Sequence, residues 1–213
     1  TEDGGLNRFN LKTKDFSFFA PSAGFTNIHG LCLVDDKLWV GTFSKGLKVI
    51  DTRSGVVLKT YQKNDSRRSL VDNTIFAICK TATGDIYLGT MFGLVRYNKQ
   101  SDDFDRIPEL NGKFIYDIHE DSAGNIWLAT YANGVYCYNV TDRKWKNYVH
   151  DDKDNTSLPY NKVSSVFEDS HRQIWLTTQG GGFCIFHPES ETFTSYNSTN
   201  GLRSDVVYQI VED

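Results

Sequence analysis

The chain has 213 residues, a formal net charge of −4 and 39% hydrophobic residues. Its lysines and arginines are scattered, which excludes the concentrated basic footprint of a nucleic-acid-binding protein, and we expect no nucleic-acid partner. The sequence has no run of 18 apolar residues and no signal-peptide pattern, so we expect this segment to make no direct membrane contact.

The predicted elements are short strands throughout. Residues 4–10 and 16–19 match the third and fourth strands of a pattern that recurs later, and Thr1 aligns with the threonine that ends its second strand. Residues 28–61 contain the full pattern of four strands separated by turns. No stretch shows the 3.6-residue periodicity of a helix.

The recurring pattern is clearest after Ile115. Residues 115–120 alternate apolar and polar side chains, as a half-buried strand does, and Asp121–Gly124 is a reverse-turn tetrad. Equivalent strands begin at intervals of 40 to 48 residues, which is typical of four-stranded β-propeller blades. The sequence predicts an all-β propeller fragment within 1–213, part of a larger propeller that we expect to have seven blades. Its predicted parts are a half blade at 1–19, full blades at 28–61, 75–107, 115–148 and 163–196, and the first strand of a next blade at 207–213.

Two recurring features have structural interpretations. One aromatic position repeats in every blade, and we interpret it as packing between neighbouring sheets rather than as a sugar-stacking ladder. Glu-Asp pairs repeat at a hairpin turn, where the aspartate is expected to bond the turn backbone, because adjacent strand residues point to opposite faces. The aromatic positions are Trp39, Tyr87, Trp127 and Trp175, and the pairs are Glu120-Asp121, Glu168-Asp169 and Glu212-Asp213.

No cofactor or metal site is expected. The histidines lack metal-ligand spacing, and Gly180-Gly181-Gly182 is interpreted as a turn rather than a phosphate-binding loop. His29 begins an inner strand, where it could meet a ligand. The four cysteines fall at positions that cannot bring their Cα atoms within about 7 Å, so we expect free, mostly buried thiols.

The candidate binding residues lie on the loops between the second and third strands and between the fourth and first strands. These loops share one face of a propeller, and loops on a rigid scaffold commonly carry binding residues. Sugar recognition uses aromatic faces against C–H surfaces and planar polar groups against hydroxyls. The candidate ligand-binding residues are Phe43, Phe92, Tyr131, Asn133, Gln179, Arg67, Arg68, Tyr160 and Arg203.

The segments IYDIHEDSAGNIWLATYANGVYCYN and VSSVFEDSHRQIWLTTQGGGFCIFH, with the linker NTSLPYNKV, resemble the two-component regulator propeller repeat. The resemblance implies the periplasmic sensor part of a hybrid two-component protein of the inner membrane. It also implies oligosaccharide ligands, control of a histidine kinase outside this segment, and a homodimer in the full-length protein. The remaining blades and adjoining sensor domains are the implied structural partners.

Two other functions are compatible with the pattern. One is a protein-interaction scaffold without a small ligand, which glycan screening would separate from a sensor. The other is a glycan-active propeller enzyme, which needs an acid, a base or an arginine cluster at the channel mouth. The sequence shows no such cluster, so we expect this segment not to be an enzyme.

Overall fold

The computed structural model describes residues 5–20, 24 and 27–213. Thr1 and Gly4, which belong to the predicted half blade, lie outside these residues. The chain divides into two compact units, Thr1–Asn111 (unit 1) and Gly112–Asp213 (unit 2). Among the described residues, the protein has no helix with the length and apolar character that a bilayer crossing requires.

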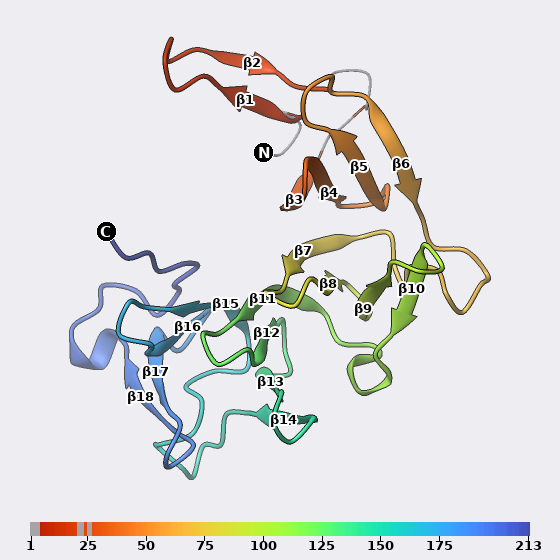
Figure 1. Ribbon diagram of the computed structural model, residues 1–213. Coiled ribbons are helices and arrows are strands. Elements are labelled where there is room, and N and C mark those ends of the chain that lie inside the picture. Colours follow the sequence, from red (N-terminus) through yellow and green to blue (C-terminus); the bar gives the residue numbers. More distant parts are fainter. Residues whose placement is uncertain (1–4, 21–23, 25–26) are drawn as a thin grey trace. The chain divides into compact units, whose positions relative to one another are not determined.

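Unit 1 contains a strand pair and two four-stranded antiparallel sheets (Figure 1). The sheets follow the chain in the orders β3-β4-β5-β6 and β7-β8-β9-β10, and a short 3-10 turn, η2 (Pro108–Leu110), follows the second. The strands are β1 (Asn7–Phe9), β2 (Phe16–Phe18), β3 (Ile28–Val34), β4 (Lys37–Thr42), β5 (Leu47–Asp51), β6 (Val57–Tyr61), β7 (Ile75–Lys80), β8 (Ile86–Thr90), β9 (Gly93–Asn98) and β10 (Asp103–Arg106).

Unit 2 contains two further sheets of the same kind, ordered β11-β12-β13-β14 and β15-β16-β17-β18 (Figure 1). A 3-10 turn, η3 (Ser198–Asn200), follows the second sheet. The predicted all-β fold of consecutive four-stranded sheets is confirmed. The strands are β11 (Ile115–Glu120), β12 (Ile126–Thr130), β13 (Val135–Asn139), β14 (Lys144–Tyr148), β15 (Val163–Glu168), β16 (Ile174–Thr178), β17 (Phe183–His187) and β18 (Thr192–Tyr196).

The core of each unit lies between its two sheets. In unit 1 the buried cluster joins Trp39 and Leu47 of the first sheet to Leu88 and Phe104 of the second. In unit 2 a matching cluster joins residues of both sheets, including Trp127. The interpretation of the aromatic column as inter-sheet packing is confirmed for the two most buried members. Trp39 meets the ring of Tyr97 edge-on at 4.9 Å, and Trp127 meets Phe186 at 5.0 Å, each in the following sheet.

The turn aspartates of unit 2 bond both the backbone of the turn and a tryptophan side chain. Asp121 Oδ1 accepts hydrogen bonds from the backbone amides of Ala123 and Asn125, as the turn interpretation predicted. Its Oδ2 accepts a hydrogen bond from the Trp127 indole at 2.8 Å. Asp169 does the same for Trp175, also at 2.8 Å. One carboxylate therefore ties each hairpin turn to the aromatic core.

All four cysteines are free thiols, as predicted, and Cys137 and Cys184 are buried. Burial raises the pKa of the Cys137 thiol to about 12 and also raises that of Cys184. Both side chains thus behave as small apolar core residues.

The segment 207–213 has no strand pairing among the described residues, and the first strand of a next blade stays a prediction for it. It is held instead by an isolated bridge between Gln179 and Val206 and by a hydrogen bond from the Val207 amide to the Thr178 carbonyl, at 2.9 Å. The carboxylate of Glu212 accepts hydrogen bonds from the backbone amide and hydroxyl of Ser170. The segment is extended, but no described residue pairs with it as a second strand, so no ladder forms.

Candidate functional site

The loops between second and third strands are fixed by a repeated threonine. Thr130 Oγ1 donates to the Gly134 carbonyl at 2.6 Å and accepts from the Asn133 amide at 2.9 Å. Gly134 has φ 70°, and a Cβ there would lie 2.1 Å from the Tyr148 carbonyl oxygen. Only glycine fits this position, so the loop backbone is locked and the loop side chains project from a rigid frame.

Unit 2 gathers aromatic side chains beside one of these loops. The Tyr131 ring stacks on Phe114 at 5.3 Å with an interplanar angle of 12°, and Tyr116 lies 4.7 Å from Phe114. Lys162 Nζ lies 4.2 Å above the Tyr131 ring, in cation–π geometry. We call Phe114, Tyr116, Tyr131 and Lys162 the Tyr131 cluster. Tyr131 is 42% exposed, so the cluster presents an accessible aromatic surface beside a positive charge.

Unit 1 has a corresponding but smaller group. The rings of His29 and Phe76 lie 4.6 Å apart, and Phe43 lies 5.8 Å from His29 and 6.3 Å from Phe76. Phe43 is 42% exposed. His29, which the sequence analysis considered for ligand contact, therefore takes part in an aromatic cluster at the loop end of its sheet.

The other predicted residues are less concentrated. Phe92 is 53% exposed on the loop after β8. Tyr160 lies against the loop that begins with Gln179, because a Cβ on Gly180 would approach the Tyr160 ring to 2.8 Å. The structure thus brings Tyr160 and the Gln179 loop together. Asn133 is half-buried within its loop, whereas Arg203 is exposed.

The two predicted arginines differ. Arg67 is exposed. The Arg68 guanidinium bonds Asp103 through two nitrogens at 2.5 and 2.8 Å and also donates to the Ser101 hydroxyl. The Arg68 carbonyl accepts from the Phe104 amide at 2.9 Å. Arg68 therefore ties the loop 62–73 to β10, a structural contact that its ligand-binding prediction did not include.

Sequence reasoning missed Phe76, Phe114, Tyr116 and Lys162 as members of these clusters. A signal was present, because His29, Phe76 and Tyr116 occupy the second position of β3, β7 and β11. This position comes directly after the loop that precedes each first strand, so it lies at the loop end of the sheet. The first strands, and not only the loops, thus build the aromatic surface.

The described residues contain no group of three or more histidine, cysteine or acidic side chains that could hold a metal ion. The Tyr131 cluster offers ring faces, a phenol hydroxyl and an ammonium group. These groups can bind a polar ligand that has apolar C–H faces, by stacking and hydrogen bonding.

Comparison with solved structures places this fold in the β-propeller class. The chain is similar to the extracellular domain of a hybrid two component system from B. thetaiotaomicron, with a TM-score of 0.78 and 22% identity, over 97% of this chain and 27% of that one. It is also similar to a catalytically inactive virginiamycin B lyase from Staphylococcus aureus, with a TM-score of 0.59 and 15% identity, over 90% of this chain and 58% of that one.

Sequence comparison identifies a repeat family that part of the chain matches. Residues 109–132 match the family model described as two component regulator propeller. The chain is 28% identical over 231 residues to Histidine kinase P4 of Formosa agariphila. That match covers all of this chain and only 16% of the length of the relative. Residues 109–132 of this propeller-class chain therefore match the two component regulator propeller repeat.

Proposed function

We propose that this chain is the ligand-sensing, extracytoplasmic propeller part of a hybrid two-component signalling protein. The repeat match, the histidine kinase relative and the similarity to an extracellular domain of a hybrid two component system support this proposal. On this proposal the segment lies in the periplasm, adjoins further sensor domains, and belongs to a homodimer in the full-length protein. The kinase that it controls lies outside these residues.

The proposed ligand is an oligosaccharide, and the Tyr131 cluster is the observation that carries this part of the proposal. Stacked, half-exposed rings suit the C–H face of a pyranose, and Lys162 and the Tyr131 hydroxyl supply hydrogen bonds. Binding would shift the sensor between two arrangements only through its differential affinity for them.

We propose that the segment performs no catalysis. The carboxylates that would suit a glycosidase are engaged in turns: Asp121 and Asp169 bond backbone amides and indole nitrogens. Paired catalytic carboxylates need to face one substrate bond. The similarity of this chain to virginiamycin B lyase is a similarity of fold alone.

A protein-interaction scaffold is the second candidate, favoured by the β1–β2 pair. Phe16 and Phe18 are 74% and 75% exposed, and Phe9 contacts Phe16 at 4.7 Å. An apolar surface of this kind suits a protein contact.

The test uses the intact sensor on an array of di- to hexasaccharides, followed by calorimetry with the strongest binder. Tyr131→Ala is expected to weaken binding about tenfold, the effect of losing one stacked ring of about 1.4 kcal/mol. Tyr138→Ala is the matched control, because Tyr138 pairs with Trp145 at 5.1 Å in the same sheet. Binding that is equal in the two variants would place the site elsewhere, and an array without any binder would favour the protein scaffold.

A further inference from the structure

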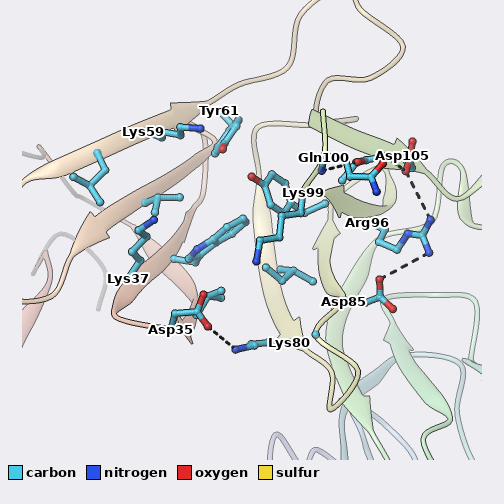
Figure 2. A pocket seen from close by; sticks show the side chains of 18 residues that line it. Asp35, Lys37, Lys59, Tyr61, Lys80, Asp85, Arg96, Lys99, Gln100 and Asp105 are labelled. Carbon is cyan, nitrogen blue, oxygen red and sulfur yellow. Dashed lines mark hydrogen bonds and ion pairs between the residues drawn. The ribbon is translucent and has the colours of Figure 1, made fainter. Parts of the chain in front are cut away.

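A groove lies between the two sheets of unit 1, at the strand ends opposite the Phe43 loop. It has a volume of about 590 Å³ and is lined from both sheets. Its lining comes from the β3–β4 and β7–β8 turns and from the β9–β10 turn. We call it the Trp39 groove and define it by Lys37, Trp39, Lys80, Arg96, Lys99 and Gln100. Figure 2 shows, among the side chains that line it, Lys80 directed at Asp35 and Arg96 directed at Asp85 and Asp105.

The indole of Trp39 differs from its counterparts in unit 2. Trp127 and Trp175 each donate their indole N–H to an aspartate at 2.8 Å. The strand register pairs Trp39 with Cys32 and Trp127 with His119, so Val34 stands where unit 2 has Asp121. No described residue accepts a hydrogen bond from Trp39, although its side chain is 5% exposed and lines the groove.

The charges of the groove favour an anion. Lys80 pairs with Asp35 at 3.2 Å, and Arg96 lies 3.9 Å from Asp85 and 3.8 Å from Asp105. Lys37 and Lys99 also line the groove, and neither forms an ion pair with a described residue. The groove therefore has more basic than acidic lining side chains: Lys37, Lys59, Lys80, Arg96 and Lys99 against Asp35, Asp85 and Asp105. Trp39, whose repeat-equivalents donate their indole N–H to a carboxylate, lines the same groove.

The remaining lining indicates the size and kind of ligand. The volume falls in the range of small-molecule sites, about 300–1,000 Å³, which a sugar of one or two rings can occupy. The rings of Tyr61 and Tyr97 and the amide side chain of Gln100 also belong to the lining. Amide groups and aromatic surface suit the hydroxyls and C–H faces of a sugar.

We propose that the Trp39 groove binds an acidic saccharide, whose carboxylate or sulfate group accepts a hydrogen bond from the Trp39 indole and is flanked by Lys37 and Lys99. The ligand oxyanion takes the place that the Asp121 carboxylate holds in unit 2. The site goes beyond the proposed loop-end site, because it lies at the opposite strand ends and uses none of the same residues.

The test follows the four tryptophan indole signals by ¹⁵N–¹H NMR, assigned with Trp39→Phe, while a uronic-acid disaccharide is added to the protein. The Trp39 signal is expected to move, whereas those of Trp127 and Trp175 stay fixed because their N–H groups are already bonded. The methyl ester of the same disaccharide, which lacks the charge, is expected to leave the Trp39 signal unchanged.

Variants test the roles of the individual groups. Lys37→Gln and Lys99→Gln are each expected to weaken disaccharide binding about three- to tenfold, the range for loss of one charge-assisted contact. Lys63→Gln, which removes an exposed charge outside the groove, is the control. Val34→Asp restores the aspartate that Trp127 and Trp175 have, so it should keep the fold and abolish binding.

Three results would overturn the proposal. The first is a Trp39 signal that does not move at saturating disaccharide, and the second is undiminished binding by Val34→Asp. The third is tighter binding of an acidic tetrapeptide than of the disaccharide, which would make the groove a peptide site. A loss of loop-end saccharide binding in Tyr131→Ala tests the proposed function separately, because that residue does not line the groove.

Discussion

Replacing Asp121 by alanine should destabilise the protein strongly, although the residue lies in a turn. Its carboxylate is 9% exposed and accepts hydrogen bonds from two backbone amides, the Asn125 side chain and the Trp127 indole. The indole is the most buried partner, because Trp127 is 3% exposed. An unsatisfied buried donor costs about 1–3 kcal/mol, and the two amides add roughly 0.5–1 kcal/mol each.

We therefore expect Asp121→Ala to lower the free energy of unfolding by about 3 kcal/mol. Asp121→Asn keeps one acceptor oxygen and should cost about 1–2 kcal/mol. The control is Asp142→Ala in the same sheet, where the side chain is exposed, with an expected change within about 0.5 kcal/mol. Urea titration followed by circular dichroism measures all three. If Asp121→Ala and Asp142→Ala were equally stable, the carboxylate would not be the link between turn and core.

Two further substitutions test the backbone of the Gly134 loop in unit 2 and the hydrogen bonds of Asp102 in unit 1. Gly134→Ala should lower the free energy of unfolding by about 2–4 kcal/mol, because its Cβ would lie 2.1 Å from the Tyr148 carbonyl oxygen. Gly124→Ala is the control: its nearest neighbour is 3.8 Å away, so it should cost about 1 kcal/mol from the positive φ alone. Equal melting temperatures of the two variants would refute the steric argument. Hydrogen bonds from Lys59, Tyr61 and Tyr97 lower the pKa of Asp102 to about 2, so this carboxylate stabilises the fold above its unfolded pKa near 4, and the stability is lost as pH falls from about 4 towards 2. Asp102→Asn, which tolerates the positive φ of 57° at this position, should be about 1 kcal/mol less stable than the parent at pH 7, a figure discounted for the 43% exposure of the side chain. The stability difference should shrink as pH falls through 2, where the folded-state carboxylate is half protonated, and vanish near pH 1; a difference that is unchanged from pH 7 to pH 1 would contradict this assignment.

Local features of the sequence were sufficient to predict the sheets. Alternation from Ile115 to Glu120 and the turn at Asp121–Gly124 depend on neighbouring residues, and the strands lie where these patterns placed them. The tryptophan column was predictable because its repetition indicates a shared environment. For the segment 207–213 a strand stays a prediction, because its strand pattern is local but strand formation requires a pairing partner.

The candidate sites were predicted only in part, because they depend on contacts between distant residues. Tyr131 was expected on its loop, but its stacking on Phe114 requires β11 and β12 to be paired. The pairing of Arg68 with Asp103 joins residues 35 positions apart and could not be inferred from spacing. The Trp39 groove was missed for a different reason. Only the strand register shows that Val34 stands where unit 2 has Asp121, and so which indole lacks an aspartate acceptor.

The junctions between neighbouring sheets carry complementary groups in a fixed order. In unit 2 the backbone amide and hydroxyl of Ser122 donate to Glu168 at the end of the next first strand. In unit 1 the corresponding positions hold Asp35 and Lys80, which form an ion pair. Exchanging the second and fourth repeats would set a glutamate against Asp35 and cost stability through like-charge repulsion. A rearranged array would therefore carry a small electrostatic penalty at each junction that brings like charges together.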